Sequence, residues 1–156
     1  MKNPVKLLSI LMTAVLVLSI ASCKKKDVDI KELQKNEGVM LTVIGIPNEP
    51  MTIEDRDACT TILKVTYDGY AFIPNPYSDK GEKISDGDYL KIYDFCVKSV
   101  ERNTFENYSE DVCDGTTYRF TFYDKAGNPT VIYDGYCYNN EELQDIKKTI
   151  EMYSVG

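Results

Sequence analysis

The sequence predicts an α+β domain of two layers, in which an antiparallel sheet of four or five strands carries two helices on one face. Three observations predict this class: an apolar run rich in β-branched residues, two pairs of strand-like segments joined by glycine-containing turns, and one amphipathic stretch after each pair. The elements therefore follow one another as β, then ββα, then ββα. Residues 39–156 are expected to form one small domain.

The first predicted strand is the run VMLTVIGI, from Val39 to Ile46. It is continuously apolar and is bounded by Pro47 and Pro50, which is typical of a buried strand. Residues 48–58 that follow are mostly polar or acidic, and we expect them to form a loop.

The first strand pair covers residues 60–67 and 70–73, joined by Asp68-Gly69. This dipeptide favours a two-residue type I′ turn, because both central residues of that turn need a positive φ. In the register that such a turn sets, Val65 faces Phe72. Tyr70 and Phe72 are therefore expected on the core side of the sheet, together with Val65.

A polar loop over residues 75–84 leads to the first predicted helix. Ser85, with Asp88 three places later, has the arrangement of a capping box, so the helix should begin there and run to about Arg102. Its apolar stripe, read from helical spacing, consists of Leu90, Tyr93, Val97 and Val100.

The second strand pair covers Thr116–Tyr123 and Pro129–Tyr138. The connecting segment DKAGN is expected to form a type I turn with Gly127 in the left-handed region. Asn140 then opens the second helix. The apolar stripe of this helix consists of Leu143, Ile146, Ile150 and Tyr153.

One side of the predicted sheet is a candidate binding face. If both helices cover the side that carries Phe120 and Phe122, the other side displays Arg119, Tyr123 and Tyr133. Tyrosines beside a cation are a composition that protein interfaces favour, and tyrosine rings can also stack on sugar rings. Two alternatives to binding are that this face packs under the first strand or that it simply faces water.

The first 22 residues have the pattern of a secretory signal peptide. Lys2 and Lys6 precede an apolar run over residues 7–20, which is shorter than a membrane span requires. This run ends at Ile20. Together with the next three residues, Ala21, Ser22 and Cys23, Ile20 forms a four-residue segment that resembles the lipobox of bacterial lipoproteins. This resemblance covers Met1 to about Asp27. The alternative is an ordinary cleaved leader followed by an incidental cysteine.

The lipobox resemblance implies that residues 1–22 are removed, that Cys23 is acylated, and that residues 23–38 tether the domain to a membrane. Two or more acyl chains hold a protein stably on a bilayer. The basic residue Lys24 directly after the cysteine offers no aspartate-type signal for retention at the inner membrane. We therefore expect a cell-envelope protein whose lipid holds it at the outer membrane.

Charge argues against a nucleic-acid partner. The whole chain has a formal charge of −7, and removal of the leader takes away two lysines and no acids, so the mature chain has a charge of −9. A nucleic-acid-binding surface needs concentrated positive charge.

The four remaining cysteines, Cys59, Cys96, Cys113 and Cys137, are expected to form two disulfides in an oxidising compartment. We favour the pairs Cys113–Cys137 and Cys59–Cys96 over the two other possible pairings. No two cysteines have the spacing of a zinc-binding arm, and the chain has no histidine, which excludes Ser-His-Asp and Cys-His catalysis. No catalytic residue, metal site or cofactor is expected.

The sequence therefore favours a non-catalytic binding lipoprotein whose partner is an envelope protein, a peptide or a glycan. One alternative is an inhibitor of an envelope-directed hydrolase that presents the 75–84 loop. Another is a small hydrolase that uses paired carboxylates, either Asp86 with Asp88 or Asp111 with Asp114. Such an enzyme requires two carboxyl groups that face each other in a cleft, one of them with a raised pKa.

Overall fold

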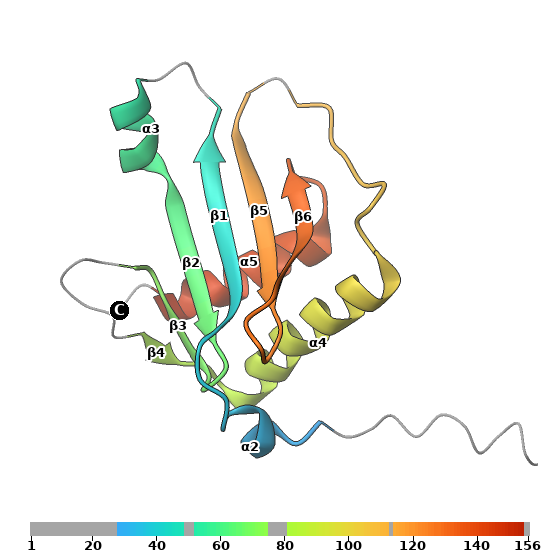
Figure 1. The fold of residues 1–156 in the computed structure, drawn as a ribbon. Coiled ribbons are helices and arrows are strands. Elements are labelled where there is room, and N and C mark those ends of the chain that lie inside the picture. Colours follow the sequence, from blue (N-terminus) through green and yellow to red (C-terminus); the bar gives the residue numbers. More distant parts are fainter. Residues whose placement is uncertain (1–27, 49–51, 75–80, 113, 155–156) are drawn as a thin grey trace, which may run out of the picture.

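The computed structural model describes residues 28–48, 52–74, 81–112 and 114–154. These residues form a six-stranded antiparallel sheet in the order β4-β3-β2-β1-β5-β6 (Figure 1). The α+β antiparallel class is thus confirmed, with more strands than predicted, because a two-residue segment of the expected 75–84 loop pairs with β3. The strands are β1 (Val39–Pro47), β2 (Thr61–Thr66), β3 (Tyr70–Phe72), β4 (Glu82–Lys83), β5 (Thr116–Tyr123) and β6 (Pro129–Gly135).

Helices α4 (Asp86–Arg102) and α5 (Glu141–Ser154) both lie behind the sheet in Figure 1 and form the second layer. Strand β1 pairs with β2 on one side and with β5 on the other, so the two ββα segments flank the first strand. Two shorter helices, α2 (Ile30–Leu33) and α3 (Ile53–Cys59), lie at the ends of the sheet (Figure 1). The segment expected to be a loop over 48–58 therefore contains a helix.

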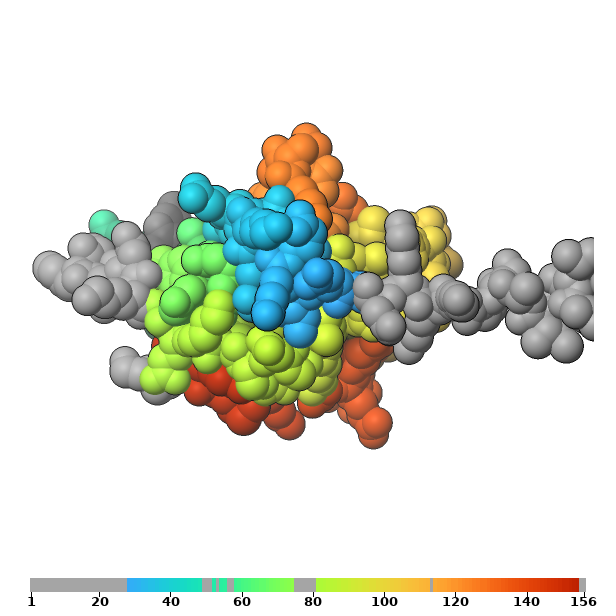
Figure 2. Space-filling model, turned by 90° about the horizontal axis from the view of Figure 1, so that it is seen from below, coloured from blue at the N-terminus to red at the C-terminus, as the bar shows by residue number. Residues whose placement is uncertain are grey.

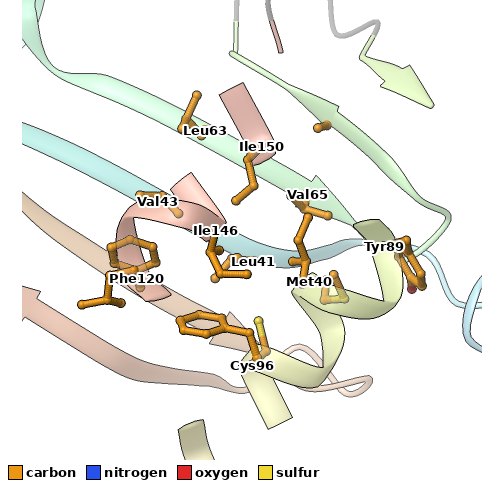
Figure 3. Packing of buried hydrophobic residues seen from close by; sticks show 14 of the residues in the cluster. Met40, Leu41, Val43, Leu63, Val65, Tyr89, Cys96, Phe120, Ile146 and Ile150 are labelled. Atoms are coloured by element: carbon orange, nitrogen blue, oxygen red, sulfur yellow. The ribbon is translucent and has the colours of Figure 1, made fainter. Parts of the chain in front are cut away.

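The core lies between the sheet and the two long helices. Figure 3 shows Ile146 and Ile150 of α5 pointing toward Val43 and Leu63 of the sheet, with Cys96 of α4 beside them. All five side chains are almost fully buried. Each large apolar side chain buried in this way contributes roughly 1.5–3 kcal/mol, so the packing of both helices against one sheet face is what holds the layers together.

Helix α4 begins as predicted but buries a different stripe. The Ser85 hydroxyl accepts a hydrogen bond from the Asp88 amide at 3.2 Å, and Asn103 ends the helix in the left-handed conformation with φ 48°. Most of the residues that face the core precede a member of the predicted stripe by one position in the sequence. The members of the predicted stripe are themselves only half-buried. Both stripes have helical spacing, so the pattern alone could not choose between them. The buried residues are Tyr89, Ile92, Phe95, Cys96 and Ser99.

The β2–β3 hairpin has a different register from the predicted one. Val65 pairs with Ala71, not with Phe72, and Lys64 pairs with Phe72. The turn holds three residues instead of two, with the Gly69 amide bonded to the Thr66 carbonyl at 3.0 Å and Gly69 at φ +85°. A shift of one residue turns every side chain to the other face. Phe72 therefore lies on the side of the sheet opposite the helices.

Part of the predicted tether belongs to the folded domain. The Asp29 side chain accepts a hydrogen bond from the Lys31 amide at 3.0 Å and caps α2. Leu33 of this helix is buried, and Ile30 packs against the core cluster. The weak apolar pattern of this segment was too short to predict a helix.

The predicted cysteine pairing is wrong for the residues that the structure describes. Cys59 is exposed on α3, whereas Cys96 is fully buried on α4, and neither forms a disulfide. Cys137 is likewise a free, buried thiol. Cys113 lies outside the described residues. Desolvation raises the pKa of Cys96 and raises that of Cys137 to about 11, so both thiols stay protonated and pack as small apolar side chains.

Candidate binding face

The side of the sheet opposite α4 and α5 is the candidate binding face, hereafter the open face. Its members follow from the pairing register, because directly paired residues of an antiparallel sheet point to the same side. They form two rows across the strands. The first row is Phe72, Lys64, Thr42, Thr121 and Val131, and the second is Ile62, Ile44, Arg119 and Asp134.

The first row crosses five strands, from β3 to β6. At its centre Thr42 and Thr121 are buried, although they point away from the helices. At its end Val131 is 55% exposed. The row thus runs from an aromatic ring, past a cation and two buried threonines, to an exposed aliphatic group.

The second row ends in an ion pair. The Arg119 guanidinium donates to one carboxylate oxygen of Asp134, from Nη2 at 2.6 Å and from Nε at 2.9 Å. Both side chains are about half exposed, so the pair contributes at most about 1 kcal/mol to stability. Ile44 lies beside Arg119, so this row has two apolar residues at one end and the ion pair at the other.

Of the three residues predicted for this face, two lie there and one does not. Arg119 and Thr121 alternate with the core residue Phe120 along β5, and Tyr123 continues that alternation as a half-buried residue. Tyr133, by contrast, is only 4% exposed and packs on the helix side, with its ring centre 6.5 Å from that of Phe120.

A bulge in β6 explains this error. Thr121 pairs with Val131, whereas Phe120 pairs with Tyr133, so Ile132 is an extra residue in β6. The extra residue turns everything after it to the opposite face. Asp134 thereby reaches the open face and meets Arg119, and Tyr133 joins the core. A single sequence gives no local signal for this bulge.

The turn between β5 and β6 forms as predicted and bounds the open face. One Asp124 carboxylate oxygen accepts hydrogen bonds from the amides of Ala126 at 2.8 Å and Asn128 at 2.9 Å, and Gly127 adopts φ +84°. Figure 2 shows the orange segment around this turn projecting on the side of the molecule away from the red helix α5. The turn therefore stands beside the sheet as a rigid projection.

At the other edge of the sheet, an aromatic ring and a cation add to the same surface. The ammonium group of Lys83 in β4 lies 4.8 Å from the ring centre of Tyr70 in β3. Tyr70 is 40% exposed. The one-residue shift of the hairpin register is what brings this ring out of the core, so the sequence prediction missed both Tyr70 and Phe72 as surface residues.

One of the carboxylates considered for catalysis, Asp88, is held by hydrogen bonds within the fold. Asp88 accepts hydrogen bonds from the hydroxyls of Tyr153 at 2.6 Å and Ser85 at 2.8 Å, and these bonds lower its pKa below the ordinary value. A carboxyl group with a lowered pKa is a poor proton donor near neutral pH. Asp88 thus holds the capping residue Ser85 of α4 and ties this helix to the last turn of α5.

Within the described ranges, no group of three or more acidic or cysteine side chains could hold a metal ion. None of the helices in these ranges has the length and apolar character needed to cross a bilayer. The loop considered for an inhibitor lies largely outside the described residues, which resume at residue 81. Comparisons with protein-family models, with curated proteins and with solved structures found no match to this chain.

Proposed function

We propose that this protein is an extracytoplasmic lipoprotein, anchored by lipid at the outer membrane, that binds a protein partner through its open face and performs no catalysis. The observation that carries the proposal is the row from Phe72 to Val131, which crosses five strands on the side away from α4 and α5. Apolar groups next to hydrogen-bonding groups and one ion pair are the mixture found in protein interfaces.

The open face is suited to binding because it is already ordered. Neighbouring strands lie about 4.8 Å apart, so the backbone fixes the spacing of the side chains within each row. Binding to such a surface orders few additional groups and therefore loses little conformational entropy. In the first row the two central threonines, Thr42 and Thr121, lie between Lys64 on β2 and Val131 on β6.

The anchor would hold the domain close to the membrane. Helix α2 begins at Ile30, seven residues after Cys23, and an extended chain of that length spans at most about 25 Å. Lys24, Lys25 and Lys26 in this interval are suited to contact anionic headgroups.

The anchor is tested by the mass of the native protein. We expect the purified mature chain to begin at Cys23, to carry fatty acid, and to enter the detergent phase on phase separation. The Cys23→Ala variant should carry no lipid and stay in the aqueous phase. A wild-type chain that still begins at Met1 without lipid would contradict the anchor and leave the domain unplaced.

Binding is tested by capture from detergent-solubilised envelopes. We expect the full-length lipoprotein to retain one or a few specific proteins, and Val131→Asp combined with Arg119→Ala to lose them. The matched control is Met152→Asp, because Met152 is 66% exposed on α5, on the opposite side of the sheet. Equal capture by the double variant and the control would contradict a role for the open face.

A further inference from the structure

A second surface, apart from the open face, contains a shallow hollow of about 260 Å³ where β6 leads into α5. Tyr138 forms one wall, and its side chain is 46% exposed. The other walls are polar. The lining residues are Tyr138, Asn139, Glu141, Gln144, Asp145 and Lys148.

The ring of Tyr138 is fixed in place. Its hydroxyl accepts a hydrogen bond from the Thr116 amide at 2.6 Å, and its ring stacks on that of Tyr136 with centres 6.1 Å apart and planes 27° apart. Tyr136 is held in turn by the Asn48 side-chain amide, which donates to its hydroxyl at 2.9 Å. The packing needs Gly115, where a Cβ atom would lie 2.4 Å from the Tyr138 hydroxyl oxygen.

The backbone beneath the ring is also held. The Glu110 carboxylate accepts hydrogen bonds from the amides of Tyr138 and Asn139, both at 2.9 Å. Desolvation acts to raise the pKa of Glu110, but these bonds and one from the Tyr108 hydroxyl outweigh it, so the pKa lies below the ordinary value. The carboxylate therefore remains charged and keeps its hydrogen bonds at neutral pH.

The polar walls retain groups that can bind hydroxyls. The side-chain amide nitrogen of Asn139 donates a hydrogen bond to the Glu110 carboxylate at 3.3 Å. That of Gln144 donates one to the Cys137 carbonyl at 2.9 Å. Their orientation is thus set, with the amide oxygens as acceptors. Among the described residues, Glu141 and Lys148 have no ion-pair partner.

We propose that this hollow binds one neutral sugar unit of a glycan. The C–H groups of a pyranose ring carry slight positive charge and pack on the negative face of an aromatic ring. Its hydroxyls both donate and accept, so they match carboxylate and amide oxygens together with an ammonium group. Lys91 pairs with Asp145 at 2.6 Å, so Glu141 and Lys148 are left as one acid and one base, and the hollow lacks the excess positive charge that a phosphate or a nucleotide would need. The hollow has room for about one sugar ring, being slightly smaller than the pockets that hold drug-sized ligands.

Saturation-transfer NMR on the full-length lipoprotein tests this site. The probes are short soluble oligosaccharides of glucose, mannose, galactose or N-acetylglucosamine, and the detergent must lack a sugar head group. We expect at least one probe to receive saturation at its ring protons. No transfer to any of the four probes would overturn the proposal.

Two variants locate the site. We expect Tyr138→Ala to weaken binding of the active probe by about tenfold or more, because it removes the aromatic wall. Glu141→Gln, at an exposed position, should weaken it by a few-fold without affecting folding. The control is Ile73→Ala, which removes an exposed apolar side chain just after β3, away from the hollow. Unchanged affinity in Glu141→Gln and in a folded Tyr138→Ala, or equal loss in Ile73→Ala, would contradict the assignment.

Discussion

The hydroxyl of Tyr89 donates a hydrogen bond of 2.8 Å to the backbone carbonyl of Tyr67. The hydroxyl of Tyr67 in turn donates one of 2.7 Å to the carbonyl of Tyr123. Both tyrosine rings are almost fully buried. Through these two bonds, hereafter the tyrosine relay, helix α4 holds the β2–β3 turn, and that turn holds the end of β5. The open-face residue Tyr123 is therefore positioned from inside the domain.

This relay predicts that Tyr67→Phe destabilises the protein. The substitution keeps the ring but leaves the Tyr123 carbonyl without its partner, which should lower the free energy of unfolding by about 1–3 kcal/mol. Urea denaturation measures this change. Tyr70→Phe, at an exposed ring, should change it by no more than about 0.5 kcal/mol. Equal values for the two variants would show that the relay contributes nothing.

The relay also predicts a loss of stability at alkaline pH. Desolvation raises the pKa of Tyr89 from 10.0 to about 12, so between these values the folded state keeps a proton that the unfolded state releases. The free energy of unfolding must then fall as the pH rises from about 10 to about 12. Denaturant midpoints across this range should fall less steeply for Tyr89→Phe than for the wild type. Parallel curves would contradict the assignment of this effect to Tyr89.

The packing of the aromatic core predicts a large effect at Phe120. Its buried ring lies 6.2 Å from that of Phe95 in α4 and 6.5 Å from that of Tyr133 in β6, measured between centres. Phe120→Ala should therefore lower the free energy of unfolding by about 3–5 kcal/mol. Val131→Ala, on the opposite side of the sheet, should cost less than about 1 kcal/mol. Thermal or urea unfolding that ranks the two the other way would contradict the assignment of faces.

The cysteines predict a distinct pattern of chemical labelling. A maleimide added to the native protein should modify the exposed Cys59 and leave Cys96 and Cys137 unmodified, because their thiols are buried and protonated. Labelling in denaturant should reach all three. Peptide mass spectrometry distinguishes these outcomes. A peptide in which Cys59 is linked to Cys96 would contradict the free thiols of the structure and support the disulfide predicted from the sequence.

The elements set by local chemistry could be predicted from the sequence. Ser85 caps α4 and the segment from Asp124 to Asn128 forms its turn, because in both cases the deciding hydrogen bonds join residues a few positions apart. The stripe of α5 was also predicted correctly. Leu143, Ile146 and Ile150 are buried, and Tyr153 packs against the core cluster.

The assignment of side chains to faces could be predicted only in part. Arg119 and Tyr123 were placed correctly because β5 pairs with β1 in an unbroken register from Thr116 to Phe122. Tyr133 and Phe72 were misplaced because one extra residue in β6, and one in the β2–β3 turn, reverse the alternation. Such one-residue differences depend on how distant segments pack, so pattern reading missed the Arg119–Asp134 pair as well.

The most direct test of the proposed function is site-specific photo-cross-linking in intact cells. Benzoylphenylalanine replaces Val131 on the open face in one variant and Met152 on α5 in another, both at exposed apolar positions. We predict a discrete cross-linked protein from position 131 that is absent from position 152. No product from position 131 in a normally expressed variant, or the same products from both positions, would contradict binding through the open face.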